Sequence, residues 1–255
     1  MKVGVKYWRS SLAVVMVVMA LIMSTSVAFA RNSNPGVFPI QSRPHGLTYG
    51  QWSARWWQFA LQQTNLNICT PDKPGSRVTF LAGTTGPPPV TRSCNVPSGM
   101  AILFPVFNVE WSVAEAQAQQ KMTPGQSCVI PGPPNGTSDA DLLACATAQA
   151  NHALDVGIGA SLEAKVDGVK LQNLPNYRAV SPPFDFTAVD GNPFSVPVGP
   201  SHAVADGFWI ILTPLSPGMH TIHFAATVPF PNVNPPATPF TFTTDATYHL
   251  MVQPG

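Results

Sequence analysis

Three acidic and imidazole side chains are the strongest candidates for chemistry in this sequence. Glu110 ends an otherwise apolar run, and His202 precedes Asp206 by four residues in "SHAVADG". Paired carboxyl groups can serve as general acid and base, and glycoside hydrolysis needs two of them facing each other roughly 5 to 10 Å apart. We therefore take Glu110, His202 and Asp206 as candidate catalytic residues of a hydrolase or lyase.

Two further histidines suggest a metal site. His223 and His249 lie in C-terminal apolar runs and would share the outer face of a sheet if those strands pair. Together with His202 they offer imidazole ligands that suit Zn, Cu or Mn. No cofactor is certain from the sequence, and a divalent metal is the one that these residues favour.

A purely structural reading of the same residues stays open. Asp206 and Gly207 can form a turn, Glu110 can meet Arg178 or Arg55 in a salt bridge, and the histidines can be scattered over the surface. The sequence contains no nucleophile elbow, no zinc-protease motif, no phosphate loop and no dinucleotide fingerprint. The residues alone therefore do not name a reaction.

The aromatic stretch "YGQWSARWWQFALQ" (49–62) must be placed before a ligand site is chosen. With Thr48 as N-cap it forms a helix with a wide apolar arc, which is typical of a helix buried on most sides. A sugar-stacking platform and a membrane-surface helix are the alternatives. The second is disfavoured because Arg55 is its only basic residue.

Binding without catalysis is the leading functional hypothesis. Trp57, Trp209 and Arg178 are the candidate ligand-binding residues, and a carbohydrate or another surface polymer is the leading partner. The alternatives are a metal-dependent lyase or hydrolase that acts on such a polymer, and a structural envelope protein. An exposed Trp209 or an exposed opening helix would support the binding hypothesis.

The first thirty residues have the pattern of a signal peptide. Three basic residues precede an apolar run over 12–23, and Ala28-Phe29-Ala30 supplies the small residues of a cleavage site. We expect residues 31–255 to form one exported β-rich domain, periplasmic or extracellular, with no stable membrane insertion after cleavage. Within it, 31–155 would carry helices and disulfides, and 156–255 the sandwich strands.

Charge and cysteine content restrict the partners and the compartment. Three of the 13 Lys and Arg residues lie in the signal, which leaves 10 against 12 Asp and Glu, so no nucleic-acid partner is expected. Four cysteines behind an export signal predict two disulfides. Three pairings are possible, and we favour the sequential one because each bridge closes one proline-rich loop: Cys69 with Cys94, and Cys128 with Cys145. Zinc is the weaker alternative, since no C-x-x-C spacing occurs.

Proline clusters separate short runs rich in Val, Ile, Phe and Tyr, which predicts an all-β fold. We expect a β-sandwich or jelly-roll-like domain with two helical additions, at 49–62 and 138–155, and two disulfides. Asp167-Gly168 predicts a type I′ hairpin, and Pro105 a bend or edge within its strand. Alternation in the closing strand places Tyr248 and Leu250 in the core.

Five stretches carry a family resemblance: "LTYGQWSARWWQFAL" (47–61), "PSGMAILFPVFNVEWS" (97–112), "LEAKVDGVKLQNLPNYRAVSPPF" (162–184), "VADGFWIILTPLSPGMHTIHF" (204–224) and "DATYHLMV" (245–252). With its YGxWxxxWWxxA, ADGxW and PGxHTIxF signatures, the sequence resembles a family of exported bacterial proteins of unknown function. The resemblance implies export and a β-rich fold, and it transfers no catalytic residue. Where the family pattern has a cysteine beside Glu110, this chain has Trp111, and Cys128 takes over that role.

Overall fold

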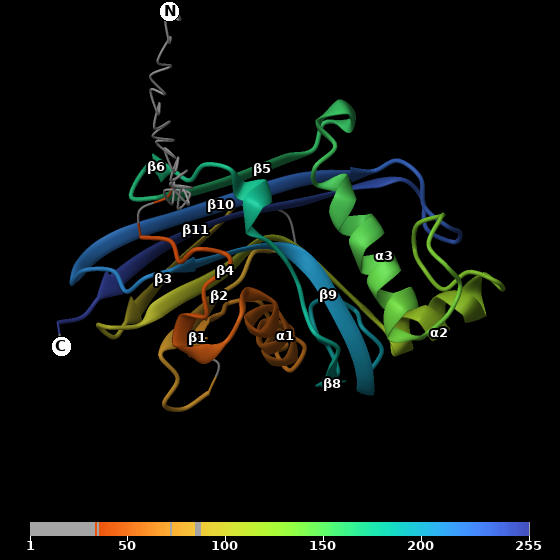
Figure 1. Ribbon diagram of the computed structural model, residues 1–255, viewed down its shortest axis with the longest axis horizontal. Coiled ribbons are helices and arrows are strands. Elements are labelled where there is room, and N and C mark those ends of the chain that lie inside the picture. Colours follow the sequence, from red (N-terminus) through yellow and green to blue (C-terminus); the bar gives the residue numbers. More distant parts are fainter. Residues whose placement is uncertain (1–33, 35, 72, 85–87, 255) are drawn as a thin grey trace, which may run out of the picture. The chain divides into compact units, whose positions relative to one another are not determined.

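The protein folds as two stacked β-sheets with helices around them (Figure 1). The structure is a computed structural model, and it describes residues 34, 36–71, 73–84 and 88–254. The predicted signal peptide, 1–30, lies outside the described residues. Two mixed sheets, added helices and two disulfides confirm the predicted β-sandwich class.

The first sheet is built around two long antiparallel strands, β4 and β9. Its strand order is β1-β2-β4-β9-β7, and β8 also pairs with β9. The strands are β1 (Cys69–Pro71), β2 (Val78–Leu81), β4 (Ala101–Ser112), β7 (Arg178–Val180), β8 (Phe184–Ala188) and β9 (Gly199–Leu212). The register between β4 and β9 shifts between Pro105 and Phe107. This irregularity confirms the bend predicted at Pro105, which has no N–H to donate to the ladder.

The second sheet has the order β3-β11-β10-β5-β6. Its strands are β3 (Val90–Val96), β5 (Ser161–Val166), β6 (Val169–Lys170), β10 (Gly218–Phe230) and β11 (Phe240–Val252). Asp167 and Gly168 have φ angles of 50° and 79°, as the predicted type I′ turn between β5 and β6 requires. Both sheets are mixed, because β2 runs parallel to β4 and β3 parallel to β11.

The main core lies between the facing sides of the two sheets. Tyr248 and Leu250 of β11 are fully buried, as their alternation predicts, and so is Phe224 of β10. Phe104 of β4 stacks on Phe224 with 4.8 Å between ring centroids. Apolar burial of this kind stabilises the fold by roughly 25 cal/mol per Å² removed from water.

Two disulfides tie distant parts of the fold together, with the sequential pairing that the sequence predicts. Cys69 of β1 is bonded to Cys94 of β3, so this bridge joins the two sheets. Cys128 is bonded to Cys145 and attaches the loop after the second helix to the third helix. Both bridges fit an oxidising compartment.

Three α-helices are present in the described residues, where the sequence predicted two. They are α1 (Tyr49–Ala60), α2 (Val113–Met122) and α3 (Asp139–His152). The two predicted helices begin at capping boxes, α1 at Thr48 and α3 at Ser138. The missed helix, α2, begins at a third capping box, formed by Ser112 and Glu115. In the part of the chain that the structure describes, no helix combines the length and apolar character that crossing a membrane requires.

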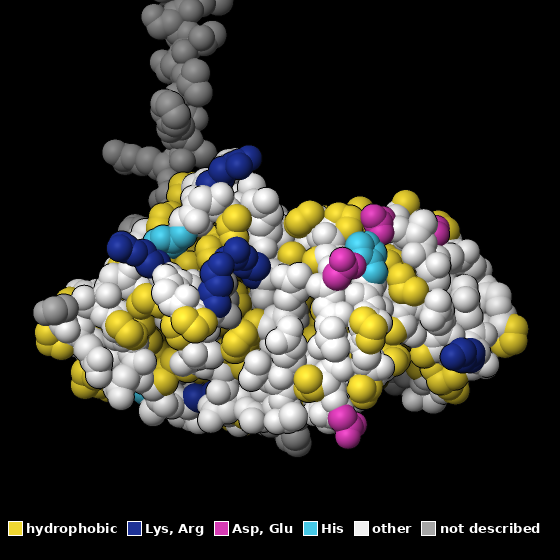
Figure 2. Space-filling model, turned by 90° about the horizontal axis from the view of Figure 1, so that it is seen from below, with side chains coloured by type: hydrophobic (Ala, Val, Ile, Leu, Met, Phe, Trp, Pro, Cys, Tyr) yellow, Lys and Arg dark blue, Asp and Glu magenta, His cyan; other side chains and the backbone are white. Residues whose placement is uncertain are grey.

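Charged side chains are sparse on the face of the molecule drawn in Figure 2. Lys, Arg, Asp and Glu stand there singly or in small groups among hydrophobic and uncharged side chains. Such a mixed surface has no broad basic stripe of the kind that follows a nucleic-acid backbone.

Candidate functional site

The three predicted catalytic residues do not converge. Glu110 of β4 is paired with Ala205 of β9, whereas Asp206 is paired with Val109. Because neighbouring side chains alternate between faces, Glu110 and Asp206 point to opposite sides of the first sheet. His202 shares a face with Asp206 but lies four residues, or ~13 Å, away along the strand. The predicted grouping of these residues is therefore wrong.

Asp206 and Arg178 form a buried structural ion pair. Asp206 is 1% exposed and accepts two hydrogen bonds from the Arg178 guanidinium, at 2.7 and 2.9 Å. Arg178 also donates to Asn151 of α3, and Asp206 accepts from Thr147 of the same helix. The turn proposed for Asp206 and Gly207 is wrong, since both lie inside β9. Arg178 pairs with Asp206 instead of Glu110, and it fixes α3 against the sheet.

His202 lies between two carboxylates. Its Nδ1 is 2.7 Å from Asp185 of β8, and its Nε2 is 2.9 Å from Asp139 of α3. The hydrogen bond with Asp185 raises the pKa of His202, and Asp139 adds to the effect. All three side chains are at least partly exposed, and His202 and Asp185 line an open hollow of about 630 Å³. This cluster joins the start of α3 to the first sheet.

The other two histidines of the predicted metal site, His223 and His249, lie on the outer face of the second sheet. The predicted pairing of their strands is confirmed, with His223 opposite Thr247 and His249 opposite Thr221. His223 lies 3.0 Å from Asp245 and 3.4 Å from Glu163, on opposite sides of its ring. Among the described residues, no group of three or more His, Cys, Asp or Glu side chains is arranged to hold a metal ion.

The tryptophans in the described part of the chain are buried. Trp209 is 0% exposed and packs on Trp56 of α1, with 5.6 Å between ring centroids. Trp52 and Trp57 of the same helix are also buried, which confirms the predicted burial of the opening helix. The prediction of Trp209 as an exposed ligand-binding residue is therefore wrong. Trp57 and Trp111 line a cavity.

We call this space the aromatic cavity; its volume is about 320 Å³. β2 pairs only with the first part of β4, up to Leu103. The cavity lies along residues 107–111 of β4, where that edge of the strand is not covered by β2, and side chains from both faces of β4 line it. Its aromatic wall is contributed by α1, β4, the loop before β9, β10 and β11: Trp57, Phe107, Trp111, Phe194, Phe230, Phe240 and Phe242. Mostly apolar cavities of this size with a few convergent polar groups are the usual form of a ligand site.

Two carboxyl groups, those of Glu110 and Glu115, also line the aromatic cavity. Burial raises the pKa of Glu110 well above its usual range, and the charge of Glu115 adds to this effect. Burial also raises the pKa of Glu115, although the hydrogen bonds from Ser112 act in the opposite direction. Glu110 therefore keeps its proton at pH values where an ordinary glutamate has lost it.

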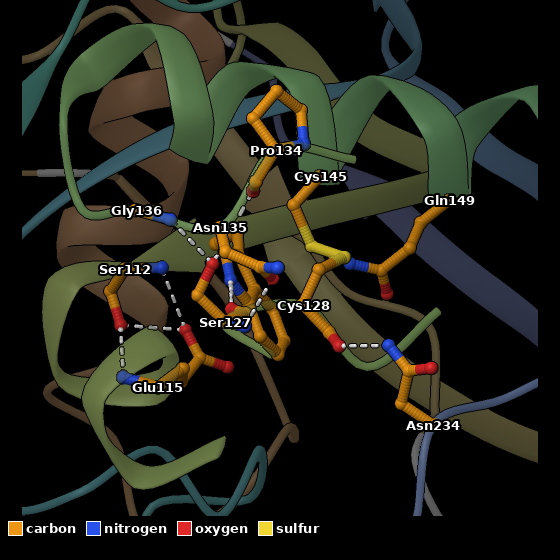
Figure 3. Close-up of a disulfide and its surroundings, with 11 residues drawn as sticks. Ser112, Glu115, Ser127, Cys128, Pro134, Asn135, Gly136, Cys145, Gln149 and Asn234 are labelled. Atoms are coloured by element: carbon orange, nitrogen blue, oxygen red, sulfur yellow. Dashed lines mark hydrogen bonds between the residues drawn. A yellow bond between two sulfur atoms is a disulfide. The ribbon is translucent and has the colours of Figure 1, made fainter. Parts of the chain in front are cut away.

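The Cys128–Cys145 disulfide lies beside Gln149 of α3 (Figure 3). Gln149 of α3 lines the cavity and donates a hydrogen bond to the Cys145 sulfur, at 3.3 Å. Asn234 donates to the Cys128 carbonyl at 2.9 Å. Asn234 lies in the loop between Phe230 of β10 and Phe240 of β11, so this bond ties that loop to the segment that carries Cys128.

Several polar atoms around the aromatic cavity are buried without a hydrogen-bond partner in the described part of the chain. They are the Trp57 indole nitrogen, the Asn108 amide nitrogen and both Glu110 oxygens, which have no N–H donor. Each such group costs roughly 1–3 kcal/mol when it stays unpaired. The aromatic wall thus carries donors and acceptors that could form hydrogen bonds with a hydroxylated ligand.

Sequence reasoning found Glu110 and Trp57 but missed their neighbours. Glu115 could have been found from the Ser112-x-x-Glu115 capping box, which places it on the first turn of a helix directly after Glu110. The Phe230 and Phe240 rings carry no such signal, because only the pairing of β10 with β11 brings them together.

Comparison with known proteins adds little to this geometry. The chain matches no protein-family model and no curated protein. The cysteine protease inhibitor EhICP2 from Entamoeba histolytica is 12% identical with a TM-score of 0.23, covering 71% of this chain and 100% of that one. Amebosin is 9% identical with a TM-score of 0.18, covering 69% and 100%. TM-scores this low carry no argument about fold or function.

Proposed function

We propose that this protein is an exported, non-catalytic binding protein that holds one sugar unit of a carbohydrate or other surface polymer in the aromatic cavity. The observation that carries the proposal is the set of unpaired buried polar atoms on an aromatic wall, above all the Trp57 indole N–H and the Glu110 carboxyl group. Unpaired polar groups in a native protein call for a ligand or water that completes them.

A sugar ring has the surface that this wall would complement. Its C–H faces pack against aromatic rings, and its hydroxyl groups both donate and accept hydrogen bonds. The Trp57 N–H and the Asn108 amide offer donors, and the carboxyl pair offers acceptors. A cavity of about 320 Å³ is within the size range of small-ligand sites.

Access to the deepest groups requires a side-chain movement. The unpaired Trp57 and Glu110 atoms are covered by neighbouring groups. Phe240 is 46% exposed, so its ring can turn outward with little loss of packing. Changes of rotamer at a binding site are common even where the backbone stays in place.

The test uses the exported protein with both disulfides intact on a glycan array, followed by titration of bound glycans through tryptophan fluorescence. Trp57→Phe keeps an aromatic ring but removes the N–H, and we expect it to weaken binding by roughly tenfold. Trp52→Phe is the matched control, because the Trp52 N–H is bonded to the Pro44 carbonyl away from the cavity.

Trp52→Phe should bind like the unaltered protein. An array without any bound glycan would refute the proposal. Equal affinities for the Trp57→Phe variant and the unaltered protein would also refute it, since the ligand would then lie elsewhere.

A further inference from the structure

The aromatic cavity contains two carboxyl groups, and none of its described lining residues is basic. Glu110 and Glu115 are the charged side chains among its described lining residues, and no Lys, Arg or His is found there. The His152 ring packs on Phe230 of the wall, with 4.9 Å between ring centroids. Buried carboxyl groups are ordinarily paired with a cation or a donor, so this arrangement is incomplete within the protein.

The two carboxyl groups have different access to the cavity. Glu110 is 5% exposed, and no N–H donor in the described part of the chain reaches its oxygens. Glu115 is only half-buried, and the backbone N–H and hydroxyl of Ser112 both donate to its Oε2, at 3.0 and 2.6 Å. These bonds hold the Glu115 side chain in place, and its Oε1 accepts neither of them. Glu115 is thus the group that an entering ligand meets first.

The surrounding rings favour the same kind of ligand. Aromatic faces carry partial negative charge and attract ammonium groups, by roughly 0.5–2 kcal/mol per contact depending on desolvation. Phe230 and Phe240 stack at 4.8 Å between centroids, and Trp57 and Phe194 meet at 4.8 Å. The carboxyl groups and the aromatic rings both attract ammonium groups, so together they suit an organic cation.

We propose that the sugar unit held in the aromatic cavity carries a free amine, so that the ligand class is a protonated amino sugar whose ammonium group meets Glu115 and Glu110. This inference rests on the proposed binding function and names its ligand. The ammonium group replaces the proton that Glu110 keeps. That proton passes to the buffer, so each binding event releases up to one proton.

Isothermal titration at about pH 6, where a sugar amine is charged, tests the inference. The probes are a β-1,4-linked glucosamine hexamer and its fully N-acetylated form, each titrated in two buffers of different ionisation enthalpy. We expect the free-amine hexamer to bind at least roughly tenfold more tightly and to release a proton. The acetylated hexamer should release none.

Two variants assign the effect to the carboxyl pair. Glu110→Gln and Glu115→Gln should each remove the preference for the free amine and the proton release. Gln at position 115 keeps a side-chain oxygen that can accept the Ser112 hydrogen bonds, so the start of α2 should be preserved. Glu163→Gln is the matched control, because that carboxyl group lies on the second sheet with Lys165 as its partner. It should retain both properties.

The outcomes separate the inference from the proposed function. Equal affinity for the two hexamers, or tighter binding of the acetylated one, would overturn the amino-sugar inference and leave carbohydrate binding in place. Preference for the free amine that survives both Gln substitutions would also overturn it. Failure of every glycan on the array to bind would refute the proposed function itself, and the inference with it.

Discussion

Glu110→Gln should weaken a pH dependence of stability that the native carboxyl pair imposes. Glu110 is buried next to Glu115, and the pKa values of both are raised, chiefly by burial. In the unfolded chain a glutamate releases its proton near ~pH 4.3. Above that pH the native pair therefore keeps a proton that the unfolded chain has lost.

The sign and size of the effect follow from this difference in bound protons. Because the native state binds more protons, the free energy of unfolding falls as pH rises above ~4.3. One retained proton costs ~1.4 kcal/mol per pH unit, or about 2 kcal/mol between pH 4.5 and 6. In the variant the new amide can donate to Glu115, which then ionises with the Ser112 bonds in place. Burial still raises the pKa of Glu115 in the variant, so the slope should become shallower without vanishing.

Urea unfolding with intact disulfides at several pH values between about 4.5 and 6 measures this slope. His202 and His220 do not contribute to the slope in this pH range. Their pKa values are raised in the native state, so the stability that they contribute is lost only above pH ~6.5. Glu163→Gln is the control, because the hydrogen bond from Lys165 lowers the pKa of Glu163 and affects stability only at lower pH. Identical slopes for Glu110→Gln and the unaltered protein would refute the reasoning.

Two further predictions concern the scaffold. Arg178→Met should lower the free energy of unfolding by about 3–5 kcal/mol, because Asp206 would remain a buried carboxylate without its cation. Urea unfolding at neutral pH measures this loss. A loss below ~1 kcal/mol would show that the ion pair is dispensable. Replacing Cys69 and Cys94 together by serine should cost ~3 kcal/mol, since the bridge closes a loop with a sequence separation of 25 and joins the two sheets. Guanidinium unfolding under non-reducing conditions checks this value, and an unchanged midpoint would contradict it.

Local patterns in the sequence determined much of the fold. Capping residues and apolar spacing predicted α1 and α3, and the strict alternation in β11 predicted which residues face the core. Asp167-Gly168 predicted the hairpin because positive φ angles are easiest for these residue types. The even cysteine count and the proline-rich loops led to both disulfides. Each of these features depends on neighbours within a few residues or on one covalent constraint.

The candidate site was decided by tertiary structure. The sequence singled out Glu110 from its apolar surroundings, but its neighbour in the structure is Glu115 and not His202 or Asp206. Glu110 lies opposite Ala205 in the sheet, so the next residue, Asp206, points to the other face. Trp209 could not be assigned to core or surface from its strand, since both faces of β9 are covered. The sequence by itself determined which side chains were available. The register of β4 with β9, and the packing of β10 and β11 beside them, decided which ones meet, because strand pairing joins residues far apart in the chain.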